Sequence, residues 1–544
     1  MRISSFENAT PERANVLYKK DFKDSLSVLK SLREARLFDI EQGYALANID
    51  AIEWTNKSAH VHYFKGEKFK TIQLTVLEED KAWLFKSTGM TEKLIKNLPF
   101  KSNDLKQLIK KSLIYAENNG YPFAKIELTD ASFKEGNLYV SLTINKGPKM
   151  IFDEIILKGD SSIAKKYLVN YINIKENDNY SELKLRQISN RIQQLPFLKE
   201  IKAHEVLFTP KGVKLYLYLE SIPVSNINGI VGLQQDPTTF QSRLTGEIQL
   251  KLQNVLKRGE LLSFNWRSIQ PETQQLNVLV NYPFLLNSPF GLDAGFDLYK
   301  RDSTFLTTKT QLGTQYFLSG GNYLKAFYEA DISNLLSGAS NGTSNLKLSN
   351  VRVNNYGIGL YRRRLDYIQN PRKGLILDMK GSVGLRNSSS LDSTATEKST
   401  TYKFETEIDW YIPLAKRHVL RVNNKTASYY AEEIFFNELY RFGGLKSQRG
   451  FNEEELFATT FSLTRLEYRF IVDKDAHAFA FYDQSFYENN SDKYYQDNPI
   501  GFGLGFSFGT NIGIFSLSYA LGKQFDNPIL LREGKVHFGY IAYF

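Results

Sequence analysis

The sequence predicts small α+β modules in tandem, followed by a transmembrane antiparallel β-barrel of about 16 strands. Three observations lead to this fold class. Helical and strand patterns mix in the first part of the chain, whereas strand patterns dominate after a junction at residues 220–232. The first part contains a repeat, and the second part alternates apolar residues with small or polar ones. Aromatic residues, 38 Phe and 32 Tyr among 544, are favoured in strands and at membrane boundaries.

The repeat defines the modules. The segments "GYALANIDAI" (43–52) and "GYPFAKIELT" (120–129) start 77 residues apart, each after a helix-like segment and before a hairpin. The helix-like segments are residues 22–42 and 102–119. In the second hairpin, apolar and polar residues alternate from Leu138 to Ile144, which is typical of a half-buried strand.

A third module starts with "IFDEIILKGD" (151–160) and ends with "VKLYLYLE" (213–220), whose Val and Leu residues share one face. Helices are expected between these strands, at about 161–172 and 181–195. We expect the first module to lack its opening strand. The predicted domains are three modules at residues 1–78, 79–149 and 150–222, and the barrel at residues 223–544.

Membrane strands are indicated most clearly by "GFGLGFSFGTNIGIFSLSYALGK" (501–523). Bulky apolar residues line one face of each strand, and Gly, Ser and Ala residues line the other. This pattern favours an apolar rim toward lipid and a hydrated interior, and closure of the barrel would remove unpaired edges. A soluble array of β-sandwiches is the alternative. The Asn- and Ser-rich residues 337–345 and 386–400 are expected to be exposed loops.

The composition does not point to an enzyme or to a nucleic-acid-binding protein. The net charge of +10 is spread thinly, without a basic block. The absence of cysteine excludes disulfides, thiolate metal sites and cysteine nucleophiles. His60 and His62 share a strand face, but no third ligand is evident. We therefore expect no metal, no cofactor and no catalytic residue, and neither a P-loop nor a nucleophile elbow.

No stretch of the sequence is apolar for long enough to predict a transmembrane helix. The first 20 residues have no apolar signal region, so we expect an exported chain to be a mature or trimmed form.

One short segment between strand patterns, "RFGGLKSQRGF" (441–451), combines glycines, a serine and an arginine. Glycine permits sharp turns and close backbone approach, and arginine presents a planar fork that matches carboxylates. In a partly dehydrated lumen such a pair holds a loop better than it would at an exposed surface. The alternative is an ordinary Gly-rich hairpin with a solvated arginine.

Several stretches, taken in order, resemble the BamA/TamA-type superfamily of outer-membrane assembly and translocation proteins. Members have periplasmic POTRA modules and a bacterial surface antigen β-barrel. The resemblance covers nearly the whole chain. The stretches are "GYPFAKIEL" (120–128), "LQNVLKRGELLSFNW" (252–266), "VNYPFLLNSPFGLDAGF" (280–296), "LDYIQNPRKGLILDMKGSVG" (365–384) and "FGGLKSQRGF" (442–451).

The resemblance implies that Arg449 belongs to a loop folded into the lumen and binds acidic groups of the barrel wall. The implied partners are Glu467, in "RLEYRF" (465–470), and Asp483, in "FAFYDQSF" (479–486). Ser485 and Gln448 depart from the family pattern, which has glycine and an apolar residue there. The implied loop signature comprises Gly443, Gly444, Ser447, Arg449, Gly450 and Phe451.

The end of the chain, "KVHFGYIAYF", resembles the last strand of outer-membrane barrels, which ends in an aromatic residue and serves as an assembly signal. The implied signal residues are Gly539, Ala542 and Phe544. In the family, this strand pairs with the first strand along a weak seam, to which incoming strands can add, as in β-augmentation.

The resemblance therefore implies a non-enzymatic assembly factor that folds, inserts or translocates β-barrel proteins in the bacterial outer membrane, with its modules in the periplasm. The implied partners are unfolded outer-membrane proteins, periplasmic chaperones or assembly proteins, and outer-membrane lipid, with no nucleic acid. The alternative is a two-partner secretion-type transporter that exports a partner protein through the pore. A passive porin or structural barrel would not explain the modules.

Overall fold

A computed structural model of the chain describes all residues except 9, 19, 94–96, 101, 160–161, 236–241, 269–272, 341–345, 369, 390–395, 446, 511–512 and 542–544. The chain divides into two compact units. The first comprises Met1–Glu154, Glu176–Leu185 and Leu207–Lys214, and the second comprises Ile155–Lys175, Arg186–Val206 and Leu215–Phe544. Among the described residues, no helix is long and apolar enough to cross a membrane.

The first module has an opening strand, which the sequence did not predict. This strand, β1, runs parallel to β3 in a sheet of order β1-β3-β2. A register shift between Ile3 and Ser5 breaks the two-residue period, so that Ile3 and Phe6, three residues apart, are both buried in the core. The sequence of β1 therefore lacks the alternation that would have predicted a strand. The elements are β1 (Arg2–Glu7), α1 (Ala14–Tyr18), α2 (Ser25–Glu41), β2 (Asn48–Trp54) and β3 (Ser58–Phe64).

The second module starts earlier than the predicted boundary at residue 78. Strand β4 pairs with β7 and therefore belongs to the second sheet, of order β5-β4-β7-β6. The helix expected at 102–119 is α5, and β7 buries Val140 and Leu142 as the alternation predicted. The elements are β4 (Thr71–Val76), α3 (Glu78–Thr88), β5 (Leu98–Pro99), α5 (Ser102–Asn118), β6 (Lys125–Lys134) and β7 (Asn137–Asn145).

The third sheet has the order β8-β10-β9. Its strand β10 buries Val213, Leu215, Leu217 and Leu219 on one face, as predicted. The first expected helix begins later, at Lys165, and the second is broken into two short helices. The elements are β8 (Phe152–Lys158), α6 (Lys165–Ile172), α7 (Glu182–Arg186), α8 (Ile188–Ile192), β9 (Leu198–Thr209) and β10 (Gly212–Ser221).

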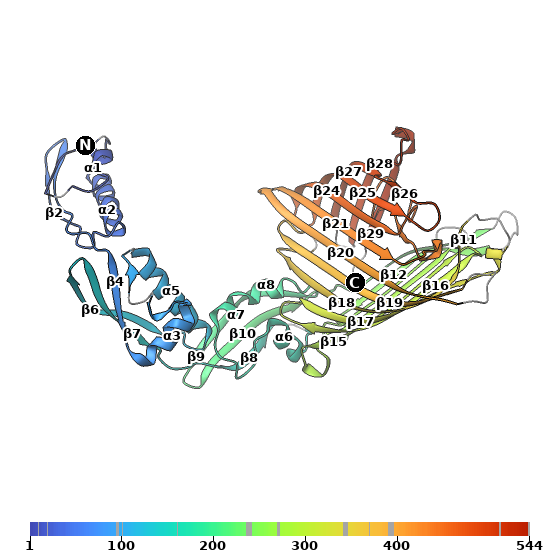
Figure 1. Ribbon diagram of the computed structural model, residues 1–544, viewed down its shortest axis with the longest axis horizontal. Coiled ribbons are helices and arrows are strands. Elements are labelled where there is room, and N and C mark those ends of the chain that lie inside the picture. Colours follow the sequence, from blue (N-terminus) through green and yellow to red (C-terminus); the bar gives the residue numbers. More distant parts are fainter. Residues whose placement is uncertain are drawn as a thin grey trace. The chain divides into compact units, whose positions relative to one another are not determined.

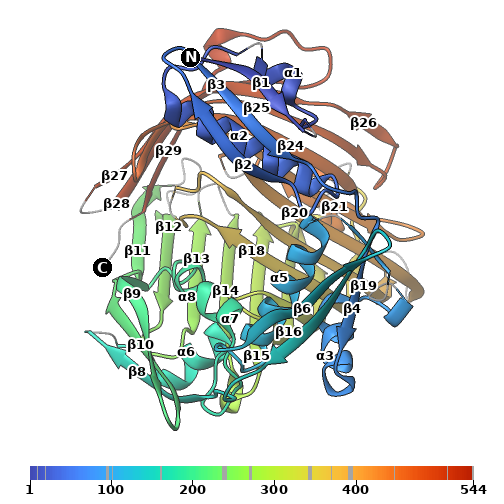
Figure 2. The same cartoon turned by 90° about the vertical axis from the view of Figure 1, so that its left-hand side faces the viewer.

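The rest of the chain forms one large antiparallel sheet, whose strands follow one another almost in sequence order (Figures 1 and 2). It has 17 strands, against the 16 or so predicted, and β26 is a short strand beside the end of β25. The strands are β11 (Asn226–Gln235), β12 (Ser242–Gln253), β13 (Leu261–Ser268), β14 (Gln274–Tyr282), β15 (Phe290–Arg301), β16 (Phe305–Phe317), β17 (Tyr323–Leu335), β18 (Asn350–Leu365), β19 (Gly374–Ser389), β20 (Glu397–Ala415), β21 (His418–Tyr430), β24 (Thr460–Asp473), β25 (Ala476–Asn489), β26 (Tyr495–Asp497), β27 (Ile500–Thr510), β28 (Gly513–Lys523) and β29 (Lys535–Ile541).

One face of this sheet exposes bulky apolar and aromatic side chains. A row of directly paired positions crosses six strands on this face, and every member is exposed. Tyrosines in such a row are typical of the level at which a barrel meets the membrane–water boundary. The row is Leu312, Tyr328, Tyr356, Val383, Tyr402 and Tyr430.

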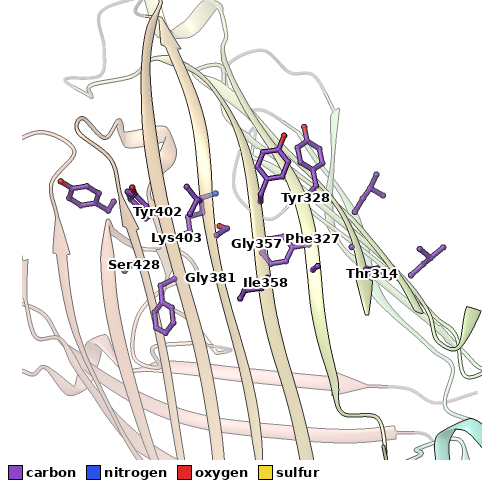
Figure 3. Close-up of a pocket in the computed structure, with 18 residues that line it drawn as sticks. Thr314, Phe327, Tyr328, Gly357, Ile358, Gly381, Tyr402, Lys403 and Ser428 are labelled. Carbon is purple, nitrogen blue, oxygen red and sulfur yellow. The ribbon is translucent and has the colours of Figure 1, made fainter. Parts of the chain in front are cut away.

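The side chains of this row line a groove of about 1040 Å³, together with the small residues Thr314, Ala326, Gly381 and Ser428 (Figure 3). The small residues leave space between the larger outward side chains. The groove therefore belongs to the outward, apolar face of the sheet.

The opposite face buries charged side chains in pairs, which inverts the arrangement of a soluble protein and agrees with the predicted polar interior. One of the two predicted exposed loops, residues 386–400, also differs from expectation, whereas residues 341–345 of the other lie outside the described residues. Residues 386–389 and 397–400 continue β19 and β20, and Arg386 points inward. The inward pairs are Lys325 with Asp293, Lys403 with Asp331 and Glu329, Arg421 with Asp409, and Arg386 with Glu438.

Within the second unit, Gln194, which follows α8, bonds the end of β18. Its side-chain amide donates to the Leu365 carbonyl and accepts from the Leu365 N–H at 3.2 Å. The Gln194 carbonyl accepts from Arg363 at 2.7 Å. Gln194 and Leu365 are both buried, so the amide satisfies a backbone N–H and C=O that water does not reach.

Replacing Gln194 with alanine is expected to destabilise this contact by about 1–3 kcal/mol, because a buried N–H and C=O lose their partner. Hydrogen exchange of the full chain in detergent should become faster at the Leu365 amide. Gln193→Ala, at the exposed neighbouring residue, is the matched control and should leave that rate unchanged. Equal exchange rates of the Leu365 amide in the two variants would contradict the role given to the Gln194 side chain.

Candidate functional site: a loop anchored inside the sheet

The connection between β21 and β24, residues 431–459, lies against the inward face of the sheet and is called the lumen loop below. It forms its own hairpin from β22 (Tyr440–Phe442) and β23 (Leu456–Ala458). The Phe442 ring stacks on Phe461 of β24, with centroids 4.6 Å apart. Apolar packing therefore fixes the base of the loop to the wall.

Two glycines and a serine shape the tip of the lumen loop. Gly443 and Gly444 have φ angles of 122° and 94°, in the left-handed region that favours glycine. The Ser447 hydroxyl accepts from the Gly443 N–H at 2.7 Å and donates to the Gly443 carbonyl at 2.8 Å. The tip is thus a closed turn held by its own side chain.

Gly450 has a different role, because it allows the backbone of the lumen loop to lie directly against the strands of the sheet. A Cβ at Gly450 would lie 2.6 Å from the carbonyl oxygen of Leu521 in β28. The facing strands also have glycines at this contact. A Cβ at Gly501 of β27 would lie 1.9 Å from the Arg449 carbonyl oxygen, and a Cβ at Gly522 of β28 would lie 2.5 Å from the Gly450 carbonyl oxygen. Glycines on both sides therefore allow backbone to pack on backbone.

Arg449 anchors the loop through a buried ionic contact. Its Nε and Nη2 donate to the two carboxylate oxygens of Asp483 at 2.7 and 2.6 Å, and its Nη1 donates to Glu467 at 2.9 Å. The guanidinium lies over the Phe481 ring, with Cζ 3.6 Å from the centroid. Arg449, Glu467 and Asp483 are 6%, 4% and 0% exposed, so these charges meet with little water between them.

The carboxylate of Glu467 is shared by further arginines of the wall. Its Oε1 accepts from Arg469 Nε at 2.6 Å, and Arg421 Nη1 lies 3.9 Å from Oε2, the oxygen that Arg449 contacts. Arg421 in turn donates twice to Asp409, at 2.8 Å each. Alternating charges thus continue from the loop across β25, β24, β21 and β20, and each carboxylate of this series is paired with an arginine.

The same loop also bonds strands near the start of the sheet. Arg441 lies over the Tyr299 ring of β15, with Cζ 3.4 Å from the centroid, and Gln275 of β14 donates to Glu454 at 2.7 Å. The lumen loop therefore reaches both early and late strands, which requires the sheet to curve around it. A cavity of about 480 Å³ remains between the loop and this side of the wall.

A second ionic anchor was missed by the sequence. Glu438 accepts from Arg386 Nε and Nη2 at 2.9 and 2.8 Å, and from the Tyr429 hydroxyl at 2.7 Å. Arg386 lies in a Ser- and Asn-rich segment that predicted an exposed loop. The pairing of Arg386 with Glu438, 52 positions later in the chain, leaves no pattern in either short segment from which it could be predicted.

The structure places the predicted site residues as follows. Glu467 and Asp483 both lie within hydrogen-bonding distance of Arg449, and Phe451 is buried beside Phe442. Gln448, which departs from the family pattern, is buried and donates to the carbonyls of Asp483 and Pro499 at 3.2 Å each.

At the C-terminus, Gly539 lies beside Leu445 of the lumen loop, whose Cδ2 would be 3.6 Å from an added Cβ. Ala542 and Phe544 lie outside the described residues. Residues 505–509 read Gly-Phe-Ser-Phe-Gly but lie within β27, whereas a nucleophile elbow requires a turn from strand to helix.

Arg449→Ala should lower the stability of the folded barrel by about 3–5 kcal/mol, because Asp483 and Glu467 would remain buried with one partner removed. The midpoint temperature at which the folded band converts to the unfolded band on a semi-native gel measures this loss. Arg352→Ala, at an exposed position of β18, is the control and should keep the wild-type midpoint. A shared midpoint for both variants would refute the anchoring role.

Gly501→Ala should displace the loop, whereas Gly381→Ala should not, because a Cβ at Gly381 meets no atom within 4 Å. Overpacking costs about 1–3 kcal/mol, which corresponds to roughly a 5- to 150-fold larger population of the displaced loop. The protein contains no cysteine, so a single Gln448→Cys reporter, placed at a buried residue, can measure this by maleimide labelling. Equal labelling in the two glycine variants would exclude close packing at Gly501.

Solved structures support the fold. CdiB from Escherichia coli has a TM-score of 0.56 to this chain at 13% identity, covering 95% of this chain and 97% of that chain. CdiB from Acinetobacter baumannii has a TM-score of 0.55 at 16% identity, with the same coverage of both chains. At these identities the likeness concerns the fold alone.

Curated sequences give a weaker match of a different kind. Chromosomal replication initiator protein DnaA of Borreliella burgdorferi is 26% identical over 254 residues, 45% of this chain and 50% of that protein. The chain thus spans about half the length of the curated relatives it matches. This match does not show a family, and the sequence contains no Gly-x₄-Gly-Lys-Ser/Thr P-loop.

The family model of the Omp85 superfamily domain matches residues 236–540, more than half of the chain. This match confirms the superfamily that the sequence resemblance indicated, and it covers the large sheet from β12 to β29 with its lumen loop, while β11 precedes it. The chain belongs to the Omp85 superfamily and is a β-barrel protein of the outer membrane, with its POTRA modules in the periplasm.

Proposed function

We propose that this protein is an outer-membrane assembly factor that folds and inserts, or translocates, other β-barrel proteins. In this proposal the POTRA modules receive unfolded chains, and the sheet closes into a barrel whose seam between β11 and β29 opens sideways. The observation that carries it is the lumen loop, which is bonded to both early and late strands. In the proposed closed barrel, a loop held in this way would obstruct an axial path.

The two ends of the sheet support a seam at this place. β11 and β29 are in contact, but no backbone ladder between them is present among the described residues. Apart from the short strand β26, neighbouring strands elsewhere in the sheet are joined by long ladders, such as the one between β18 and β19. A short contact is easier to open than a ladder, and the freed strand edges can pair with an incoming strand.

The modules offer edge strands for the same kind of pairing. β9, at the edge of the third sheet, exposes Ile201, Leu207 and Phe208. β6, at the edge of the second sheet, exposes Leu128 and Phe133. An edge strand with exposed apolar side chains can bind an extended segment of an unfolded β-barrel protein. Backbone hydrogen bonds then provide the affinity, and contacts with side chains provide the specificity.

A two-partner secretion-type transporter is the second candidate. The likeness to CdiB, over 95% of this chain, favours it. That type resembles this chain but normally carries an N-terminal plug helix and two POTRA modules. Here three small sheets precede the large one, and Arg2–Glu7 is a strand of the first.

Reconstitution tests the proposal. Liposomes that contain the full-length protein should accelerate the folding of a urea-unfolded β-barrel protein, measured as its heat-modifiable band, compared with empty liposomes. Arg449→Ala should reduce this folding rate by a larger factor than it reduces the amount of the variant itself in the liposomes. Arg352→Ala is the matched control and should keep the wild-type rate. Folding at the rate of empty liposomes, together with export of a co-expressed partner across the membrane in cells, would reject assembly in favour of secretion.

A further inference from the structure

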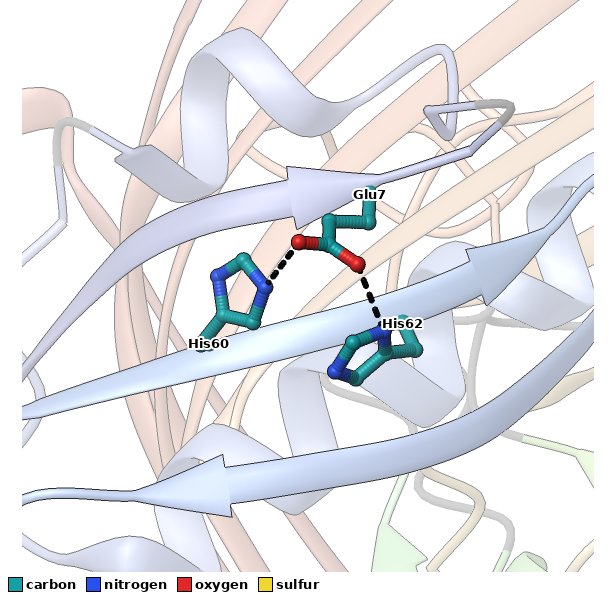
Figure 4. A group of neighbouring side chains, drawn as sticks. All are labelled: Glu7, His60 and His62. Atoms are coloured by element: carbon teal, nitrogen blue, oxygen red, sulfur yellow. Dashed lines mark ion pairs between the residues drawn. The ribbon is translucent and has the colours of Figure 1, made fainter.

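The first POTRA sheet carries two histidines and two glutamates on the face opposite its core. The strands β1, β3 and β2 are neighbours, and their register pairs Glu7 with His62 and His60 with Glu53. His60 and His62 share one face of β3 because they are two residues apart, while Val61 is buried on the other. Figure 4 shows the Glu7 carboxylate between the two imidazoles.

The distances bring three metal-binding groups together. Glu7 Oε1 lies 2.8 Å from His60 Nε2, and Glu7 Oε2 lies 2.8 Å from His62 Nδ1. One donor atom from each residue lies within 4.8 Å of the others. The imidazoles are about a quarter exposed, so an ion from solution can reach them.

We propose that Glu7, His60 and His62 form a Zn²⁺ site, with the fourth position open to water. Two histidines and one glutamate are a ligand set of open zinc sites, whereas Ca²⁺ and Mg²⁺ prefer oxygen ligands alone. Ligands about 2.0–2.2 Å from a tetrahedral ion lie roughly 3.3–3.5 Å from one another. The carboxylate would therefore move back by about half an ångström, and the imidazole donor atoms, which lie within 4.8 Å of the other ligand atoms, would adjust to the same spacing.

Glu53 completes the arrangement as a positioning residue. Its Oε1 lies 3.5 Å from His62 Nε2, the ring nitrogen that faces away from Glu7. When Nδ1 binds the ion, the ring proton resides on Nε2, where the Glu53 carboxylate can accept it. A carboxylate behind a histidine ligand is the usual device that fixes the ring and its tautomer.

The ion would join β1 to β3 through side chains. β1 is an edge strand and contains the register shift between Ile3 and Ser5, so its backbone ladder is interrupted. A bridge at Glu7 lies at the far end of β1 from Arg2 and would hold the last residue of that strand. Zn²⁺ should therefore protect β1 from local opening, because an ion that binds only the closed form stabilises it.

The test uses the full chain in detergent, purified through a tag without histidine and treated with a chelator. Co²⁺ titration should yield visible absorption bands of low-symmetry coordination that saturate at one ion per chain, and Zn²⁺ should abolish them. Each of Glu7→Gln, His60→Gln and His62→Gln should weaken Co²⁺ binding at least about tenfold, and Glu53→Gln roughly tenfold. Zn²⁺ should also slow hydrogen exchange in β1.

His204→Gln, at a histidine of the third module that lies beside Glu200 and is about one-fifth exposed, is the matched control and should bind Co²⁺ as the wild type does. Circular dichroism of the metal-free proteins checks that the variants fold. Because the Glu7 side chain is half exposed, Glu7→Gln decides the question if a histidine variant unfolds. An unchanged titration in Glu7→Gln, or the lack of saturable bands in the wild type, would mean that the cluster is only a hydrogen-bonded triad.

Discussion

The contact of Arg449 with Asp483 and Glu467 is the interaction on which the packing against the inward face of the large sheet depends. A guanidinium buried among apolar and aromatic groups is tolerable only when its charge and its N–H donors are matched, and two carboxylates on adjacent strands match it. That contact fixes the end of the lumen loop. The loop then carries Arg441 and Glu454 to the opposite strands, so one ionic contact determines what fills the lumen.

Much of this arrangement could be predicted from local patterns. Alternating bulky and small residues at 501–523 identified strands with one lipid-facing side, and Leu504 and Phe506 are indeed exposed. The repeated Gly-Tyr segments located the helices α2 and α5 of the modules. Both signals are periodic over short stretches, which is why a single sequence suffices to detect them.

Other features depend on contacts that no short stretch records. Strand β1 was missed because a register shift places Ile3 and Phe6 on the same side, against the two-residue period. The role of Gly501 depends on the Arg449 backbone, which folds against it from another segment. Glu7 becomes a partner of His60 and His62 only through the parallel pairing of β1 with β3, more than 50 residues later in the chain.

The lumen loop also bears on the choice between an axial and a lateral route. An axial route requires the loop to leave both walls. At the late strands, parting a buried arginine from its carboxylates costs about 3–5 kcal/mol, and at the early strands each hydrogen bond adds about 0.5–1.5 kcal/mol. A lateral opening between β11 and β29 leaves these bonds intact, because Arg449 binds β24 and β25, and Gln275 and Tyr299 belong to β14 and β15. Since Leu445 of the loop lies beside Gly539 of β29, the same loop would also contact the strand at the proposed seam.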